Sequence, residues 1–161
     1  MDFKAVYEKK PWLRFYPEGV GETIPIAEKS LPDLFDEVTH KYGGKAALVF
    51  YGKKISFKEL KEQVDRFACG LSDLGVKRGD RVALYLLNSP QYVISYFGTL
   101  KAGATVTPIS PVYTSMEVKY QLLDSEAKYI VCQDILFENV EKARVNLQEV
   151  IVTNIGEYLP L

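Results

Sequence analysis

The sequence has little of what membrane proteins, secreted proteins and metalloproteins need. Its longest uninterrupted apolar runs, 46–51 and 82–87, hold six residues each, whereas a helix that spans a bilayer needs about 20. The start of the chain carries acidic and basic side chains where a signal peptide has an apolar stretch. Its two cysteines, Cys69 and Cys132, are too far apart for a CxxC or zinc pattern. These absences predict a cytoplasmic protein that is kept reduced.

An excess of charge of one sign is also missing. Lys and Arg number 20, Asp and Glu number 21, and the formal net charge is -1. No arginine-rich stretch interrupts this balance, so a polyanionic partner such as nucleic acid is not expected. What the chain does have is 161 residues, 47% of them hydrophobic, which is enough for one domain with a real core.

Catalytic signatures are scarce as well. His40 is the single histidine, so a Ser-His-Asp triad or a multi-histidine metal site has few ways to exist. There is no G-x-G-x-x-G, G-x-S-x-G or H-E-x-x-H motif. Residues 98–105 superficially match a phosphate-binding loop, but Ala104 occupies the place of the lysine, and the segment ends a helix instead of opening one. We therefore predict no catalytic, cofactor-binding or metal-binding residue in this chain.

The first 29 residues show neither a helical nor a strand period. Prolines and glycines punctuate this segment, and proline fixes φ and removes a backbone donor. We predict an extended N-terminal arm over 1–29 that lies along a surface, with a frayed terminus as the alternative. The remainder, 30–161, is predicted to be an α/β subdomain. The arm's larger apolar side chains are Trp12, Leu13, Phe15 and Tyr16.

The first helix is expected directly after Ser30, an N-cap residue that is followed by Pro32 in the first turn. Apolar residues then recur at spacings of three and four until the two glycines at 43–44. His40 lies off this apolar face, so we expect a solvated side chain without a catalytic role.

A hairpin and a second helix should follow. The strand over 46–51 is expected to turn back through Gly52 and Lys53, with glycine at the first central position of the turn. The next helix begins with a capping box, in which Ser56 and Glu59 satisfy free backbone N–H groups reciprocally.

Strands and helices alternate over the rest of the chain. Cys132 lies at the end of a short apolar run, where we expect a small core side chain. Regular alternation with short connections predicts an α/β fold with three layers, a mainly parallel sheet and flanking helices. The predicted strands are 81–87, 105–109, 129–132 and 150–153, and the predicted helices lie within 89–102, 114–125 and 135–143.

Several short motifs, weak one by one, resemble those of the adenylate-forming superfamily in order and spacing. Residues 55–60 resemble its first core motif, [LI]-[ST]-[YF]-x-[EQ]-L, and residues 100–108 resemble the second, L-K-A-G-x with a following proline. Between them, 79–83 and 88–90 stand in the family's order. Each motif also has a structural role of its own, as a helix cap, a helix end or a strand edge.

Two further segments narrow the resemblance. Residues 110–117 are similar to the N-P-L-Y-T-x-x-E motif of acyl-CoA synthetases, with Ser110 in place of the usual asparagine. Residues 11–20 resemble the opening of fatty acyl-CoA synthetases that act on medium to long chains. The resemblance runs from about Lys10 to Gly156 and covers only the front part of the family's longer polypeptide.

The resemblance implies an AMP-forming fatty acid–CoA ligase that uses ATP, Mg2+ and coenzyme A. In such enzymes the phosphate loop, the nucleotide-binding section and a mobile lysine lie downstream of the matched region. The chain would then be an N-terminal scaffold fragment, inactive alone and with no bound cofactor, which self-associates through an exposed docking face. The parent enzyme would be cytoplasmic, with peripheral membrane attachment left open.

Two other interpretations stay open. The chain could be a stand-alone truncated module for binding or interaction, without catalysis, since kinship of fold does not fix function. An unrelated nucleotide-binding α/β domain is the third hypothesis.

Overall fold

A computed structural model describes residues 3–26 and 28–160, and its centre is a four-stranded parallel sheet. The strand order is β4-β3-β5-β6, and each neighbouring pair is parallel. The two middle strands are apolar along most of their length because the sheet is covered on both faces. The predicted α/β fold with a mainly parallel sheet is confirmed. The strands are β3 (Arg81–Tyr85), β4 (Thr105–Pro108), β5 (Tyr129–Gln133) and β6 (Glu149–Thr153).

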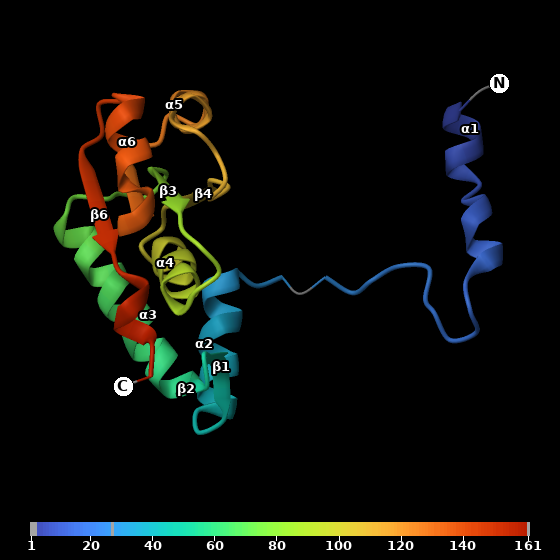
Figure 1. The fold of residues 1–161 in the computed structure, drawn as a ribbon. Helices are drawn as coiled ribbons and strands as arrows, with labels where there is room; N and C mark the ends of the chain where they lie inside the picture. The colour runs from blue at the N-terminus through green and yellow to red at the C-terminus, as the bar shows by residue number, and fades with distance from the viewer. Residues whose placement is uncertain (1–2, 27, 161) are drawn as a thin grey trace.

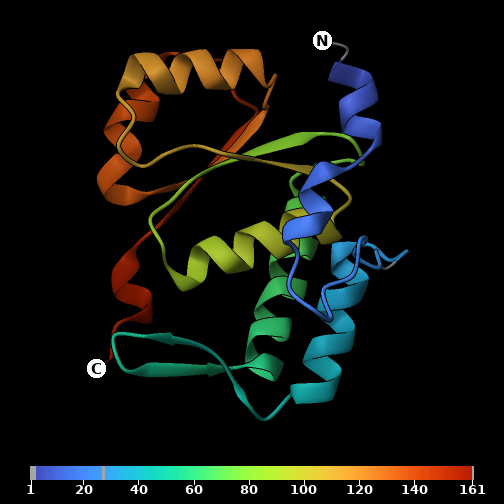
Figure 2. The same cartoon turned by 90° about the vertical axis from the view of Figure 1, so that its right-hand side faces the viewer.

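Helices cover the two faces of this sheet, so the fold has the three predicted layers (Figure 2). Leu84, on one face, packs in a cluster with Leu71 of α3, and Tyr85, on the other face, packs with Val118 of α5. Successive strand residues point to opposite faces, which is why one strand serves both clusters. The covering helices are α3 (Phe57–Asp73) and α4 (Pro90–Lys101) on the first face, and α5 (Ser115–Asp124) and α6 (Phe137–Ala143) on the second.

A third cluster joins α2 (Leu31–Tyr42) and a small hairpin to the outer side of α3 and α4. Phe35 of α2 stacks on Phe97 of α4, with ring centroids 4.4 Å apart. Ile55 of the hairpin is buried in the same cluster. The hairpin consists of β1 (Ala46–Phe50) and β2 (Lys53–Ser56), which pair antiparallel.

The hairpin turn differs from the prediction by one residue. Phe50 pairs with Lys53, so the two central residues are Tyr51 and Gly52, not Gly52 and Lys53. Both have positive φ, 47° and 86°, which is the signature of a type I′ turn. The apolar run includes Tyr51 and therefore overstates the strand, while the pairing places this residue in the turn.

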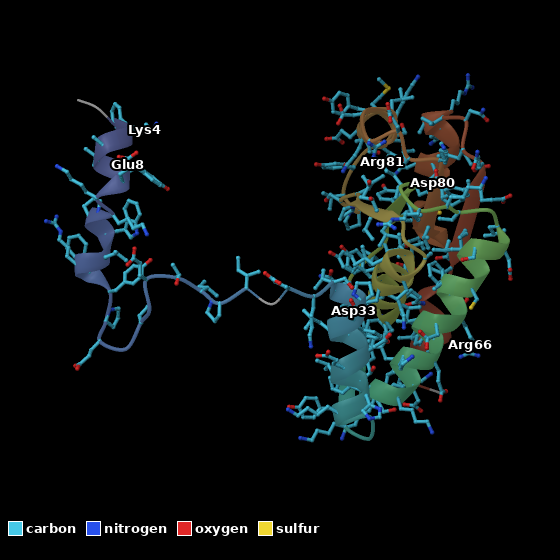
Figure 3. The ribbon with its side chains drawn as sticks, turned by 180° about the vertical axis from the view of Figure 1, so that it is seen from behind. Lys4, Glu8, Asp33, Arg66, Asp80 and Arg81 are labelled. Atoms are coloured by element: carbon cyan, nitrogen blue, oxygen red, sulfur yellow. The ribbon has the colours of Figure 1, made fainter. Side chains whose placement is uncertain are left out.

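The sequence predicted an arm that is extended over its whole length, but the structure contains two short helices there. It contains α1 (Phe3–Glu8) and the 3-10 helix η1 (Pro11–Phe15). Proline suits the start of a helix because its missing N–H would have no helical partner there. The arm lies away from the body of the protein in two views (Figures 1 and 3). The boundary at residue 30 stays a prediction.

The two helix caps predicted from the sequence are present, and α4 begins without a capping bond. Ser30 accepts a hydrogen bond from the Asp33 N–H at 3.3 Å, and the Ser56–Glu59 capping box is complete. Ser89 occupies the N-cap position of α4, but its hydroxyl makes no capping bond. Of the helices in the described part of the chain, none is long and apolar enough to cross a membrane.

Candidate functional site

The sheet topology marks one edge as the place where a ligand would bind. From β3 the chain passes to β4 on one side, and β5 then lies on the other side of β3. In open parallel sheets, ligands bind outside the carboxyl ends of the strands at such a reversal. The candidate site therefore comprises the segments that follow β3 and β5, with the segment that follows β6 beside them. We call it the carboxyl edge.

Amide side chains connect the three segments of the carboxyl edge. Gln133, at the end of β5, is fully buried, and its Oε1 accepts a hydrogen bond from the Leu87 N–H at 3.2 Å. This bond explains why β3 ends at Tyr85 and not at Leu87, because the Leu87 N–H turns to a side chain instead of a neighbouring strand. Gln91 of α4 donates from Nε2 to the Asn154 carbonyl at 2.8 Å.

Three buried polar atoms at the carboxyl edge have no hydrogen-bond partner among the residues that the structure describes. They are the Ser89 hydroxyl, the Gln91 Oε1 and the Gln133 Nε2. A buried group without a hydrogen bond costs about 1–3 kcal/mol, so water or another polar group is expected to fill each position. These are neutral donors and acceptors. They could hold a neutral polar molecule, but they lack the positive side chain that a phosphate loop provides.

Hydrogen bonds of the Tyr85 hydroxyl hold the loop that precedes α5 in place. The Tyr85 hydroxyl, at the end of β3, donates to the Tyr113 carbonyl at 2.7 Å and accepts from Asn139 Nδ2 at 3.1 Å. Tyr85 is fully buried. The contact fixes the 110–117 segment against α6 and leaves none of these polar groups free for chemistry.

The segment 98–105 forms the end of α4 and the turn after it, not a phosphate loop. Gly98 lies inside the helix against α3, where a Cβ atom would come within 2.7 Å of Phe67 Cδ1. Gly103 has a φ of 80°, which only glycine adopts readily, and its N–H bonds to the Leu100 carbonyl. Both glycines therefore serve packing and chain reversal.

The sequence singled out three other side chains, and the structure separates them. His40 is exposed on α2, Cys69 is exposed on α3, and Cys132 is buried in β5. Burial, followed by the charge of Asp134, raises the pKa of the Cys132 thiol to about 11, which makes it a poor nucleophile. In the described part of the chain, no three His, Cys, Asp or Glu side chains are close enough together to hold a metal ion.

The lysine of the 100–108 motif is a structural cation. Lys101 Nζ lies 2.7 Å from Asp36 of α2 and 2.5 Å from Asp65 of α3. Burial acts to lower the pKa of Lys101, but the hydrogen bonds to the two carboxylates outweigh it and hold the pKa above its ordinary value. The ammonium group thus connects three helices instead of facing the carboxyl edge.

Comparison with known protein families shows which family the chain belongs to. The family model described as AMP-binding enzyme matches residues 35–160. The chain belongs to the AMP-binding enzyme family.

Relatives within the family point to fatty acid–CoA ligases. The chain is 36% identical over 154 residues to a long-chain-fatty-acid–CoA ligase of Bacillus subtilis, and 39% identical over 155 residues to one of Escherichia coli O6:H1. Each alignment covers 94% of this chain but only 28% of the relative. The chain thus spans little more than a quarter of the length of these relatives.

Solved structures of family members have the same fold. A long-chain-fatty-acid-CoA ligase from Archaeoglobus fulgidus superimposes with a TM-score of 0.75 at 29% identity, over 89% of this chain and 32% of the other. A benzoate CoA ligase from Burkholderia xenovorans superimposes with a TM-score of 0.72 at 25% identity, over 76% and 25%. The sheet and its helices therefore match one portion of these longer ligase structures.

The polar groups of the carboxyl edge were not predicted from the sequence. Gln133 stands at the end of an apolar run, and an amide in that position is the one signal that could have been noticed. Ser89 stands at the N-cap position of α4, but its hydroxyl makes no capping bond. Gln91 and Asn154 lie 63 positions apart, and only the fold brings them together.

Proposed function

We propose that this chain is the N-terminal scaffold of an AMP-forming ligase that joins a medium- or long-chain fatty acid to coenzyme A. The supporting observation is that the similarity to long-chain-fatty-acid–CoA ligases covers 94% of the chain and only 28% of the ligases. In the parent enzyme, the acid would attack the α-phosphate of Mg-ATP to give acyl-adenylate and pyrophosphate. The thiol of coenzyme A would then displace AMP.

The family-motif residues act in this proposal through structure. The Glu59 carboxylate accepts hydrogen bonds from the Ser56 N–H and hydroxyl, both at 2.8 Å. The Glu117 carboxylate does the same for Thr114. Lys101 binds two carboxylates. Side chains that are committed to caps and ion pairs hold helices in place, which is a scaffold's contribution to the parent enzyme.

The residues of the carboxyl edge do not fit Mg-ATP. Its buried groups without partners are neutral, and the described residues bring no three metal-binding side chains together. We propose that other parts of the parent enzyme hold ATP, Mg2+ and coenzyme A, and that the 161-residue chain alone is inactive. Calorimetry should detect no micromolar affinity of the chain for Mg-ATP, and such an affinity would contradict this part of the proposal.

The ligase assignment is tested on the longer parent protein. Purified parent enzyme should release pyrophosphate when a medium- or long-chain fatty acid is added to ATP, and should release AMP when coenzyme A follows. A folded parent protein that binds ATP and shows neither reaction with any fatty acid would refute the assignment.

The stand-alone interaction module is the second hypothesis, and the gene separates it from the first. A reading frame that continues into a Ser/Thr/Gly-rich loop supports the ligase, whereas a stop codon after Leu161 supports the module. In either case we propose a cytoplasmic protein whose exposed apolar face leads to self-association. Val150 and Val152, both exposed on the same side of β6, support such a face, because large exposed apolar patches usually mark contact sites.

A further inference from the structure

We infer that two copies of this chain pair through the outer edge of β6 and the adjoining face of α3, related by a two-fold axis that passes near Ile151. The inference rests on the self-association proposed above and names its surface and symmetry. The surface, which we call the β6–α3 face, consists of residues 149–153 and of Arg66, Gly70, Asp73 and Leu74. Figure 1 shows α3 (green) and β6 (red) along the same side of the body.

β6 presents an unpaired row of backbone groups. It is the last strand of the sheet and pairs only with β5 among the described residues. The Gln148 N–H bonds to the Lys128 carbonyl, toward β5. Because backbone groups of successive strand residues point in opposite directions, those of Glu149, Ile151 and Thr153 point outward. An exposed edge of this kind is a template for another strand.

A second β6 can complete this row in an antiparallel register centred on Ile151. Ile151 then faces Ile151 of the partner subunit, and Glu149 faces Thr153 of the partner subunit. These are the outward-pointing residues, so each pair exchanges two backbone hydrogen bonds. On the opposite face of the sheet, Val150 faces Val152 of the partner subunit, both exposed in the single chain. Within the paired strands, no like charges lie directly opposite each other.

The charges on the exposed face of α3 complement those of a second copy related by the same two-fold axis. Arg66 and Asp73 lie seven residues apart on one side of the helix, and both line a groove of about 700 Å3 that also includes Ile151. Gly70 lies midway between them, and a Cβ atom there would meet nothing within 4 Å. Two antiparallel α3 helices would place Arg66 beside Asp73 of the partner subunit, twice. A two-fold interface requires such self-complementarity.

The opposite edge of the sheet is closed to the same pairing. β4 ends at Pro108, which has no N–H to donate. The Pro108 carbonyl already accepts a hydrogen bond from Gln121 Nε2 at 2.7 Å. The pairing therefore ends at two copies and does not continue into a filament.

Charge exchange on α3 tests the arrangement in the 161-residue chain. Arg66→Glu or Asp73→Lys alone places like charges together at two symmetric positions, so sedimentation equilibrium should show at least about tenfold weaker dimerisation. The double variant reverses both charges and should restore the dissociation constant to within about threefold. Lys119→Glu, an equal change of charge on exposed α5, should leave it unchanged.

A cysteine at the axis tests the strand register. In an antiparallel hydrogen-bonded pair the two Cα atoms are about 5.5 Å apart, which a disulfide can bridge. Ile151→Cys in a Cys69→Ser background should therefore form a covalent dimer on mild oxidation. Val49→Cys in the same background, on the exposed side of β1, should stay monomeric under the same conditions.

The possible outcomes distinguish three claims: the self-association, the geometry of the dimer and the ligase assignment. A chain that is monomeric at high concentration overturns both the self-association and this geometry. A dimer that is indifferent to the α3 charges and to the cysteine at 151 overturns only the geometry. Neither result touches the ligase assignment, which depends on pyrophosphate release by the parent enzyme.

Discussion

Gly98 of α4 lies so close to Phe67 of α3 that a Cβ atom at position 98 would be 2.7 Å from Phe67 Cδ1 and 3.2 Å from the Val64 carbonyl oxygen. The two helices can therefore pack on the sheet in their observed positions because residue 98 has no side chain. Lys101, one turn further along α4, then reaches Asp65 of α3. The close approach thus positions the motif lysine.

Gly98→Ala should destabilise the chain although alanine is the better helix former. Overpacking costs about 1–3 kcal/mol, which exceeds the gain of about 1 kcal/mol in helix propensity. Gly70→Ala is the matched control, because a Cβ atom at position 70 meets nothing within 4 Å, and it should stabilise the chain by about 0.5–1 kcal/mol. Urea unfolding at concentrations where the chain is monomeric gives both values. Equal signs would contradict the packing argument.

Gly103→Val should lower the yield of folded protein. Its φ of 80° is costly for any residue with a Cβ atom and most costly for a β-branched one, and we expect a loss of about 1–2 kcal/mol or more. Gly103→Asn should be milder, since asparagine tolerates this region. The nearest atom to a Cβ at this position is Arg78 Cβ at 3.5 Å, an ordinary contact. Similar losses for valine and asparagine would point to crowding instead of φ.

Acid should weaken the chain partly through its capping boxes. Hydrogen bonds from the Ser56 backbone and then from its hydroxyl lower the pKa of Glu59 below the ordinary 4.5, and hydrogen bonds from Thr114 do the same for Glu117. A lowered folded-state pKa gives stability that is present above about pH 4.5 and is lost as the pH falls through the folded-state value.

Glu59→Gln together with Glu117→Gln should therefore flatten the pH dependence below 4.5, because glutamine keeps the capping geometry without a titrating group. Thermal unfolding between pH 3 and pH 7 measures this difference. Identical slopes in the wild-type chain and the variant would show that the boxes do not contribute to it.

The two cysteines should differ sharply in reactivity. A thiol with a pKa of about 11 is hardly ionised at pH 8, and Cys132 is fully buried, whereas Cys69 is exposed. A thiol reagent should modify Cys69 quickly and Cys132 only on unfolding. Cys69→Ser should abolish the fast phase, and a fast phase that survives in this variant would contradict the buried position of Cys132.

Neither His40 nor Cys132 should be needed for catalysis by the parent ligase. His40→Ala, on the exposed side of α2, and Cys132→Ala should leave turnover of the folded enzyme within about tenfold, or about 1.4 kcal/mol of barrier. Fatty-acid-dependent pyrophosphate release is the measurement. A folded His40 variant that loses several orders of magnitude in rate would show that this segment is more than a scaffold.

The sequence by itself determined the order of elements, the parallel sheet and the family. These follow from local signals: apolar periodicity within a helix or strand, caps such as Ser56 and Glu59, and motifs read in order along the chain. The helical content of the arm and the hairpin turn at Tyr51 were predicted wrongly, because a proline-rich segment can still start a short helix and strand pairing fixes a turn.

Only the tertiary structure decided which distant residues meet. Gln91 reaches Asn154 across 63 positions, and Lys101 reaches Asp36 across 65. No local pattern encodes such contacts, since they depend on the strand order β4-β3-β5-β6 and on how closely α4 approaches α3. The same holds for the β6–α3 face, where Ile151 and Gly70 line one groove because β6 is the outermost strand on the side that α3 covers.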